Sequence, residues 1–197
     1  MTSSSSRPPA AAASARGGSM PRNIEIKARV SSLEQLETST RSIRSEPVQL
    51  LTQDDTFFHC NAGRLKLRDF GNGRGELIAY RRPDQAGPKT SQYRISPSSD
   101  PDGLRRTLSE ALGVLGRVRK RRRVIMIGRT RLHLDRVEGL GDFMELEVVL
   151  EDGESIDAGM QEAESLMADL AISPADLIEG AYIDLLLAPG AEDAVSS

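Results

Sequence analysis

The stretch Gly63-Arg64-Leu65-Lys66-Leu67-Arg68 alternates cationic residues with leucines, and this pattern decides the fold class. Successive side chains of a β-strand point to opposite faces, so such a strand has one charged face and one apolar face. The same alternation recurs in Asn23-Ile24-Glu25-Ile26-Lys27, in Arg129 to Asp135 and in Phe143 to Leu150. The dominant period of the chain is therefore two, which indicates a β protein.

Eight strands are predicted, with turns between them. They cover residues 22–30, 48–59, 63–70, 75–82, 90–96, 117–126, 129–137 and 142–150. Gly71-Asn72-Gly73 lies between two of these strands, which predicts a hairpin turn and argues against a nucleotide-binding loop. Four helices are expected to begin near Ser31 or Ser32, Asp100, Ser155 and Ser173. Eight closely linked strands with separate helices favour an α+β fold, an eight-stranded antiparallel closed β-barrel with helices packed outside.

The composition limits the class of protein. The chain has 197 residues, enough for one domain with a real core, and its single cysteine, Cys60, excludes an internal disulfide framework. No apolar stretch approaches the roughly 18 residues of a membrane span, so no membrane partner is expected.

The two ends are expected to lie outside the domain. Residues 1–19 lack acidic side chains and apolar bulk, which predicts a disordered N-terminal extension, with organelle targeting as the alternative. Residues 189–197 predict a disordered tail. The domain is thus expected over residues 20–188, with the cytoplasm as the default location.

Charge is distributed unevenly along the chain. Residues 1–137 hold all 26 Lys and Arg and 13 acidic residues, whereas residues 138–197 hold 16 acidic residues and no base. This asymmetry indicates either a nucleic-acid-binding half or two halves that share one site. The basic run 119–123 has no interleaved aromatic residue and the chain is only 4% aromatic, which argues against nucleic acid as a partner.

Individual strands are also segregated by the sign of their charge. Alternation alone is explained most simply by a sheet whose charged face lies in water. Like charges about 7 Å apart along a strand, however, gain nothing in water. They make sense if cations surround a multiply charged anion while carboxylates hold its counter-metal. The apolar faces would then point outward under the helices, the reverse of an ordinary small barrel.

In their order and spacing these strands resemble the CYTH superfamily, named for class IV adenylyl cyclases and mammalian thiamine triphosphatase. The resemblance runs from about Met20 to Leu187. It rests on residues 23–27, 63–68, 118–122 and 131–135, and on Gly139-Leu140-Gly141-Asp142-Phe143-Met144-Glu145-Leu146-Glu147, which is especially similar to the cyclase branch. The resemblance implies an eight-stranded tunnel that binds a triphosphate with Mg²⁺ or Mn²⁺.

The resemblance also implies roles for individual residues. The implied metal ligands are Glu25, Glu145 and Glu147. The implied phosphate contacts are Lys27, Arg64, Lys66, Arg68, Arg81, Arg82, Lys120, Arg122, Arg131 and His133. The implied catalytic residues are Glu147, Asp135 and Lys27, with Glu147 or Asp135 orienting the attacking water. His133 has a second interpretation, as a residue that only satisfies hydrogen bonds within the protein.

Several positions depart from the family pattern or lie outside it. Asn23 stands where the family has the first Glu of Glu-x-Glu-x-Lys, which removes a charge and puts the metal affinity or a second metal site in question. Arg81 replaces a lysine that usually lies two residues before the proline, and Arg82 is the alternative contact. Asp54 and Asp55, which precede Phe57-Phe58, are expected in a turn or at the surface.

The expected function is hydrolysis of a triphosphate compound: inorganic tripolyphosphate, thiamine triphosphate or a nucleoside triphosphate. A triphosphate carries about four negative charges, for which Arg and Lys are suitable partners. Transfer at phosphorus needs positioning and charge neutralisation more than a nucleophilic side chain. One alternative is a class IV-type adenylyl cyclase, and another is a non-catalytic polyphosphate-binding module. The expected partner is a small-molecule triphosphate, and the protein is expected to be a monomer or a homodimer.

Overall fold

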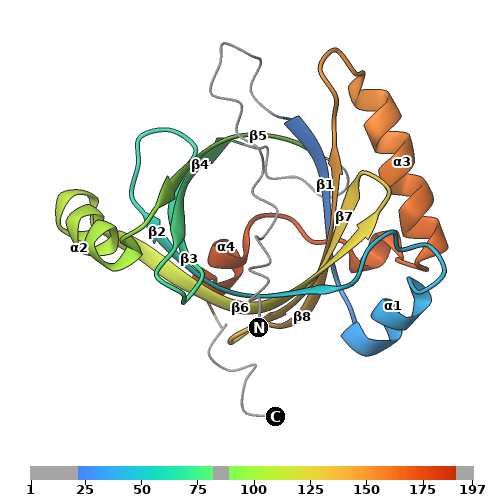
Figure 1. Cartoon of the computed structure of the whole chain (residues 1–197), viewed down its shortest axis with the longest axis horizontal. Helices are drawn as coiled ribbons and strands as arrows, with labels where there is room; N and C mark the ends of the chain where they lie inside the picture. Colours follow the sequence, from blue (N-terminus) through green and yellow to red (C-terminus); the bar gives the residue numbers. More distant parts are fainter. Residues whose placement is uncertain (1–21, 82–88, 190–197) are drawn as a thin grey trace, which may run out of the picture.

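The strands close into a single antiparallel barrel, as predicted. A computed structural model of the protein describes residues 22–81 and 89–189, and Figure 1 looks along the barrel axis. The strand order around the barrel is β1-β5-β4-β3-β2-β6-β7-β8. The strands are β1 (Arg22–Arg29), β2 (Gln49–Phe58), β3 (Arg64–Asp69), β4 (Gly75–Arg81), β5 (Lys89–Ser98), β6 (Val114–Ile127), β7 (Thr130–Val137) and β8 (Gly141–Val149).

Side-chain caps explain where the first three helices begin. These are α1 (Leu33–Ser39), α2 (Pro101–Leu112) and α3 (Ile156–Asp169). Ser32, Asp100 and Ser155 each accept a hydrogen bond from a backbone N–H in the first turn. Such caps satisfy donors that have no partner within the helix. The three helices therefore begin close to the positions expected from the sequence.

The fourth expected helix is divided into two pieces. A short 3₁₀ turn, η1 (Pro174–Asp176), is followed by extended residues and then by α4 (Tyr182–Leu187). The backbone N–H of Ile178 donates to the carbonyl of Lys27 at 3.0 Å, and Leu177 forms a β-bridge with Ala28. Pairing with the end of β1 takes these backbone groups away from a helix, which explains the interruption.

The main hydrophobic core lies outside the barrel wall. The outward apolar residues of β1, β7 and β8 pack against α1 and α3. The fully buried members of this core are Ile24, Ile26, Ala28, Ile125, Leu132, Leu134, Met144, Leu146 and Val148 on the strands, with Ala163 on α3. Figure 1 shows α1 and α3 on the outer side of these strands. The sequence-based expectation of an inverted barrel, with its apolar faces outward, is confirmed.

The short helix α4 lies across one end of the barrel. Its residues Tyr182 and Ile183 pack with Phe57, Val118 and other apolar residues that face inward at this end. The absence of a side chain at Gly116 makes room, because a Cβ there would lie 2.5 Å from Cδ1 of Ile183. In Figure 1 the helix is visible behind the ring of strands. We refer to this as the α4 end of the barrel.

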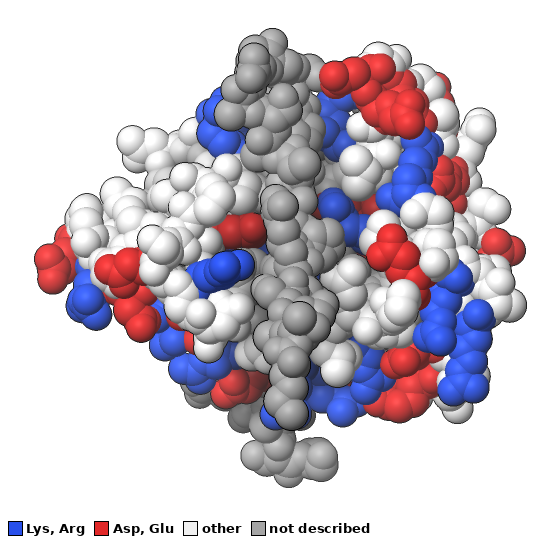
Figure 2. Space-filling view, viewed as in Figure 1, with Lys and Arg blue, Asp and Glu red and all other residues white. Residues whose placement is uncertain are grey.

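Three outward cations of β6, Arg117, Arg119 and Arg123, are paired with acidic side chains. Arg117 donates two hydrogen bonds to Asp54, and Arg123 forms ion pairs with Glu34 and Glu37. On the face shown in Figure 2, Lys and Arg are interspersed with Asp and Glu. The basic run of the sequence is thus divided between the two sides of the wall. Within the described ranges, none of the helices has the length and apolar character to cross a membrane.

Candidate functional site

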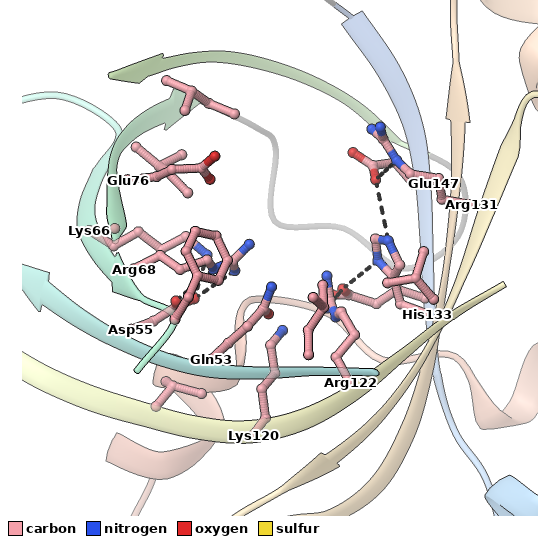
Figure 3. A pocket seen from close by; sticks show the side chains of 18 of the residues that line it. Gln53, Asp55, Lys66, Arg68, Glu76, Lys120, Arg122, Arg131, His133 and Glu147 are labelled. Carbon is pink, nitrogen blue, oxygen red and sulfur yellow. Dashed lines mark hydrogen bonds and ion pairs between the residues drawn. The ribbon is translucent and has the colours of Figure 1, made fainter. Parts of the chain in front are cut away.

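The interior of the barrel is a cavity of about 890 Å³ lined by residues of all eight strands, and its described charged side chains come from every strand except β5. Figure 3 shows these side chains converging on it from opposite walls. The charged residues at the cavity that carry the argument below are Glu25, Lys27, Asp55, Lys66, Arg68, Lys120, Arg122, Arg131, Glu145 and Glu147. The period of two along each strand explains this convergence, because alternate residues of a barrel strand all face inward.

The first charged cluster joins β2 to β3. Asp55 accepts hydrogen bonds from Lys66 Nζ at 2.7 Å and from Arg68 Nε and Nη2 at 2.8 Å each. Burial raises the pKa of the Asp55 carboxyl, but the two cations outweigh it and hold this pKa well below its usual range. Burial also lowers the pKa of the Lys66 ammonium to about 7, an effect that Arg68 reinforces and Asp55 opposes.

Asp55 corrects an expectation from the sequence. Instead of occupying a turn or the surface, its side chain faces the cavity and is only 2% exposed. Its neighbour Asp54 faces outward and pairs with Arg117. The two adjacent aspartates therefore have different environments because consecutive residues of a strand face opposite sides.

The second cluster centres on Asp135 of β7, which is fully buried. It accepts two hydrogen bonds from Arg122, one from Lys120 Nζ at 3.0 Å and one from the Tyr182 hydroxyl at 3.0 Å. Burial and Arg122 lower the pKa of the Lys120 ammonium while Asp135 raises it, and the net result is a pKa of about 8. Arg122 also donates to Glu145 Oε2 at 2.6 Å, which extends the cluster to β8.

Lys27 connects this cluster to the α4 end. Its ammonium lies 3.0 Å from Glu145 Oε1, and it donates to the carbonyl of Gly180 at 3.3 Å. The same ammonium lies 4.0 Å from the ring centroid of Tyr182, and that of Lys120 lies 4.9 Å from it. A cation over an aromatic face is attracted to it, so Tyr182 contributes to fixing both lysines.

The third cluster surrounds Glu147 of β8. Its Oε2 accepts from Arg131 Nε at 2.7 Å, and its Oε1 accepts from the Asn23 amide. Burial raises the pKa of Glu147, but Arg131 and His133 outweigh this, so its pKa is below the usual value. The Nδ1 atom of His133 lies 3.8 Å from Glu145 Oε2, and its Nε2 atom lies 3.7 Å from Glu147 Oε2. Figure 3 shows His133 on the same side of the cavity as Glu147. Burial and Arg122 lower the pKa of His133, which favours its neutral form.

The comparisons with known proteins agree with this architecture. Residues 21–182 match the CYTH domain family. The chain belongs to the CYTH family. No curated protein matches this CYTH chain significantly.

Solved structures share the fold of this CYTH domain. The PH1012 protein of Pyrococcus horikoshii OT3 is 22% identical, with a TM-score of 0.73, and the match covers 83% of this chain and 98% of that one. A Vibrio parahaemolyticus protein proposed to be an adenylate cyclase is 18% identical, with a TM-score of 0.69 and coverage of 87% and 100%. A Hippeastrum protein proposed to be an adenylyl cyclase, with a dominant triphosphatase activity, is 18% identical, with a TM-score of 0.55 and coverage of 78% and 89%. At these identities the likeness shows the fold alone.

Several residues expected in the CYTH site lie elsewhere. Arg64 faces the α4 end, where it donates to both carboxylate oxygens of Asp184 at 2.7 and 2.8 Å. Arg81 is exposed and lies on the face of β4 opposite to Tyr80, which lines the cavity. Arg82 lies outside the described residues. The structure therefore does not bring Arg64 or Arg81 to the main cavity.

Arg129 also departs from the expected pattern. Instead of sharing the inner face with Arg131, it precedes β7 and forms ion pairs with Glu154 and Glu162. The turn at Gly128, where φ is +58°, places it before the strand begins.

The structure adds cavity residues that sequence reasoning missed. Besides Asp55, these are Gln53 of β2, Glu76 of β4 and Tyr182 of α4. Gln53 and Glu76 occupy inward positions of their strands, so alternation was the signal that could have found them. Tyr182 has no such signal, because its position depends on how α4 packs.

Oxygen donors suited to Mg²⁺ or Mn²⁺ gather on β1 and β8. Glu25 lies directly opposite Glu147 in the strand pairing. The Asn23 Oδ1 atom is buried and accepts no hydrogen bond from the described residues. Carboxylates and an amide oxygen are ligands that these cations take. The described residues contain no preassembled group of three His, Cys, Asp or Glu around a metal position. The donors therefore fit such a cation chemically.

Proposed function

We propose that this CYTH domain is a divalent-metal-dependent hydrolase of triphosphate compounds. The observation that carries the proposal is the convergence of cations from four strands on one cavity. These cations are Lys27, Lys66, Arg68, Lys120, Arg122 and Arg131. Ion pairs within the wall hold them in place, which pre-organises the cavity for a multiply charged anion.

The carboxylates at the cavity have two roles in this proposal: some position the cations, and one orients the attacking water. Asp55 and Asp135 are buried and hold their cations in fixed positions, so we assign them a positioning role. Glu147 faces the cavity, and we assign it the orientation of the attacking water. The water oxygen forms a bond to the terminal phosphorus, and the bond from this phosphorus to the bridging oxygen breaks. Orthophosphate and the shortened phosphate chain leave.

Divalent metal completes the charge balance of this proposal. We assign Glu25, Glu145 and Glu147 as its ligands, with Asn23 as a neutral oxygen donor beside them. When bound, Mg²⁺ or Mn²⁺ would neutralise negative charge on the phosphate oxygens. The carboxylates now paired with Lys27 and Arg131 would be released from these partners as the phosphates replace them.

Adenylyl cyclase activity is the second candidate. It is favoured by the sequence from Gly139 to Glu147, which resembles the cyclase branch of the family. In that reaction the ribose hydroxyl attacks the α-phosphorus and pyrophosphate leaves. Both reactions need the same cationic cage, and they differ in which phosphorus faces the nucleophile.

An assay of the full chain with Mg²⁺ and then Mn²⁺ tests the proposal. Tripolyphosphate, thiamine triphosphate and ATP are offered separately, and orthophosphate, pyrophosphate and cyclic AMP are measured. Orthophosphate without cyclic AMP supports the hydrolase, whereas cyclic AMP with equal pyrophosphate establishes the cyclase. Tight triphosphate binding without turnover in either metal identifies a binding module.

A pair of variants on one strand controls this assay. Lys120→Gln changes an inward residue of β6, and Arg121→Gln changes its exposed, outward neighbour. We expect Lys120→Gln to lower kcat/KM by at least roughly 100-fold, since it removes a charge-assisted contact to phosphate. Arg121→Gln should remain within about twofold of the parent protein. Equal effects of the two changes would argue against the barrel interior as the active site.

A further inference from the structure

The charged residues occupy only part of the cavity. The inward residues of β6, beginning at the α4 end, are Val118, Lys120, Arg122, Val124 and Met126. The inward residues of β2 in the same direction are Phe57, Asp55, Gln53, Leu51 and Gln49. Both strands thus change from apolar to charged and back to mainly apolar. The first apolar layer packs against α4, whereas the second lies at the opposite end of the barrel.

Strand pairing places the members of this second layer in two groups, one on β2 and β6 and the other on β4 and β5. Leu51 lies opposite Arg122, and Val124 lies one inward position further along β6. On β4 and β5, Ile78 pairs with Ile95, and the next inward residue of β5 is Pro97. All of these residues line the cavity. We call Leu51, Ile78, Ile95, Pro97, Val124 and Met126 the apolar collar.

The collar lies apart from the two hydrophobic clusters that pack against the helices, although its members Ile78 and Val124 are buried. None of its six residues belongs to either hydrophobic cluster of the described residues. Leu51, Ile95 and Met126 are partly exposed and Pro97 is exposed, although all four face the cavity. Apolar surface left facing a cavity is characteristic of a site that binds an organic group.

The wall formed by β1, β7 and β8 remains polar at the same end. Its inward residues there include Asn23, Arg131 and Glu147. An occupant of this end therefore meets apolar side chains from β2, β4, β5 and β6 and polar side chains from the remaining wall. This environment suits a group that has both apolar surface and hydrogen-bonding atoms.

Gln53 supplies an independent indication. It lies between the charged layer and the collar, is 3% exposed, and points toward the cavity in Figure 3. Its Oε1 accepts no hydrogen bond from the described residues. Ionised phosphates have oxygen acceptors and no donors, so they leave such an oxygen unsatisfied. A hydroxyl or amino group of an organic substrate can donate to it.

We propose that the substrate is an organic triphosphate whose non-phosphate group lies against the apolar collar, and that inorganic tripolyphosphate is a poor substrate. This inference rests on the proposed function of the same cavity. Burial of about 100 Å² of apolar surface corresponds to a roughly 70-fold gain in affinity. Inorganic tripolyphosphate has no apolar surface with which to obtain this gain.

The test compares kcat/KM of the full chain for tripolyphosphate, ATP, CTP and thiamine triphosphate under one metal condition. We expect at least one organic triphosphate to exceed tripolyphosphate by more than about tenfold. If tripolyphosphate is cleaved as well as every organic compound, the inference is overturned while the proposed function stands. If none of the four compounds is cleaved or bound, both are overturned.

Two apolar residues provide the matched variants. Leu51→Ser changes a collar residue, whereas Ile156→Ser changes a residue of α3 that is 42% exposed and does not line the cavity. Leu51→Ser should lower kcat/KM for the preferred organic triphosphate about tenfold and leave tripolyphosphate within twofold, and Ile156→Ser should alter neither. Met126→Gln is the second collar variant if Leu51→Ser does not fold. An equal loss for organic and inorganic substrates would refute the collar as a specificity site.

Discussion

Arg122 holds Asp135 through two parallel hydrogen bonds, from Nε to Oδ1 at 2.6 Å and from Nη2 to Oδ2 at 2.5 Å. Burial raises the pKa of Asp135, but Arg122 and Lys120 outweigh it, so the net shift is downward. The carboxylate is therefore ionised in the folded protein although it is fully buried. Asp135 orders two cations of the cavity and has little basicity for catalysis.

Replacement of Asp135 by Asn should destabilise the protein by about 3–5 kcal/mol near pH 7, because two buried cations lose their partner. The native pKa of Asp135 is lowered, so its ionic stabilisation is present above the unfolded pKa of about 3.9 and is lost as the pH falls through the native pKa. The difference in unfolding free energy between parent and Asp135→Asn should thus shrink below about pH 4. Urea unfolding from pH 7 to pH 3 measures it.

The surface pair of Arg136 and Asp142 provides the control for that experiment. Arg136 is 55% exposed in this pair, and Asp142 accepts two hydrogen bonds from it. Asp142→Asn should cost less than about 1 kcal/mol, since solvent screens exposed ion pairs. A pH-independent difference for Asp135→Asn would show that packing, and not charge, is responsible.

Binding of triphosphate should depend on the charge of Lys66. Its pKa is lowered to about 7, so the unliganded ammonium loses its proton as the pH rises above this value. A bound phosphate favours the charged form, so binding above pH 7 should take up a proton, and the contribution of Lys66 to affinity should fall. Calorimetry with tripolyphosphate at pH 8, in two buffers of different ionisation enthalpy, measures the uptake.

Lys66→Arg is the matched variant, because a guanidinium remains charged over this range. It should reduce the proton uptake while it retains binding, and Lys120, whose pKa is about 8, accounts for the uptake that remains. Identical uptake in the parent and in Lys66→Arg would assign the proton to another group, such as the ligand.

The sequence predicted those site residues whose positions depend on local alternation. Alternation predicts an inward position for a cation that lies two residues from another inward cation. This holds for Lys66, Arg68, Lys120 and Arg122, which all line the cavity. Asp55 was missed because polar and aromatic residues occur in adjacent pairs along this part of β2, which hides the alternation. The period of two is enough to predict the strands of the barrel wall. Where two adjacent residues are of the same type, however, only the pairing of the strands shows which of the two faces inward.

Long-range packing could not be predicted in the same way. Tyr182 reaches Asp135 across 47 residues, and Arg64 reaches Asp184 across 120. Both contacts depend on the docking of α4, which in turn depends on the extended segment at Leu177 and Ile178. A local pattern contains no information on such contacts, which explains why Arg64 was assigned to phosphate.

Asn23→Glu should strengthen binding of Mn²⁺ in the absence of substrate. The change removes an amide donor from Glu147 and adds a carboxylate close to Glu25, which lies opposite Glu147. Higher charge among oxygen ligands raises cation affinity, and we expect a roughly tenfold gain. Electron paramagnetic resonance of free Mn²⁺ measures it, with Asn23→Gln as the neutral control. Unchanged affinity in Asn23→Glu would place the metal away from residue 23.

Arg64 and Arg68 should differ in their effect on triphosphate affinity although both belong to β3. Arg64 is bound to Asp184 at the α4 end, whereas Arg68 lines the cavity beside Asp55. Arg68→Gln should weaken tripolyphosphate binding by at least roughly tenfold, since it removes a charge-assisted contact. Arg64→Gln should lower the thermal midpoint by a few degrees and leave affinity within about twofold, because a half-exposed ion pair contributes about 1 kcal/mol. Titration of both folded variants with tripolyphosphate measures their affinities. Equal losses of affinity would show that Arg64 also contacts phosphate.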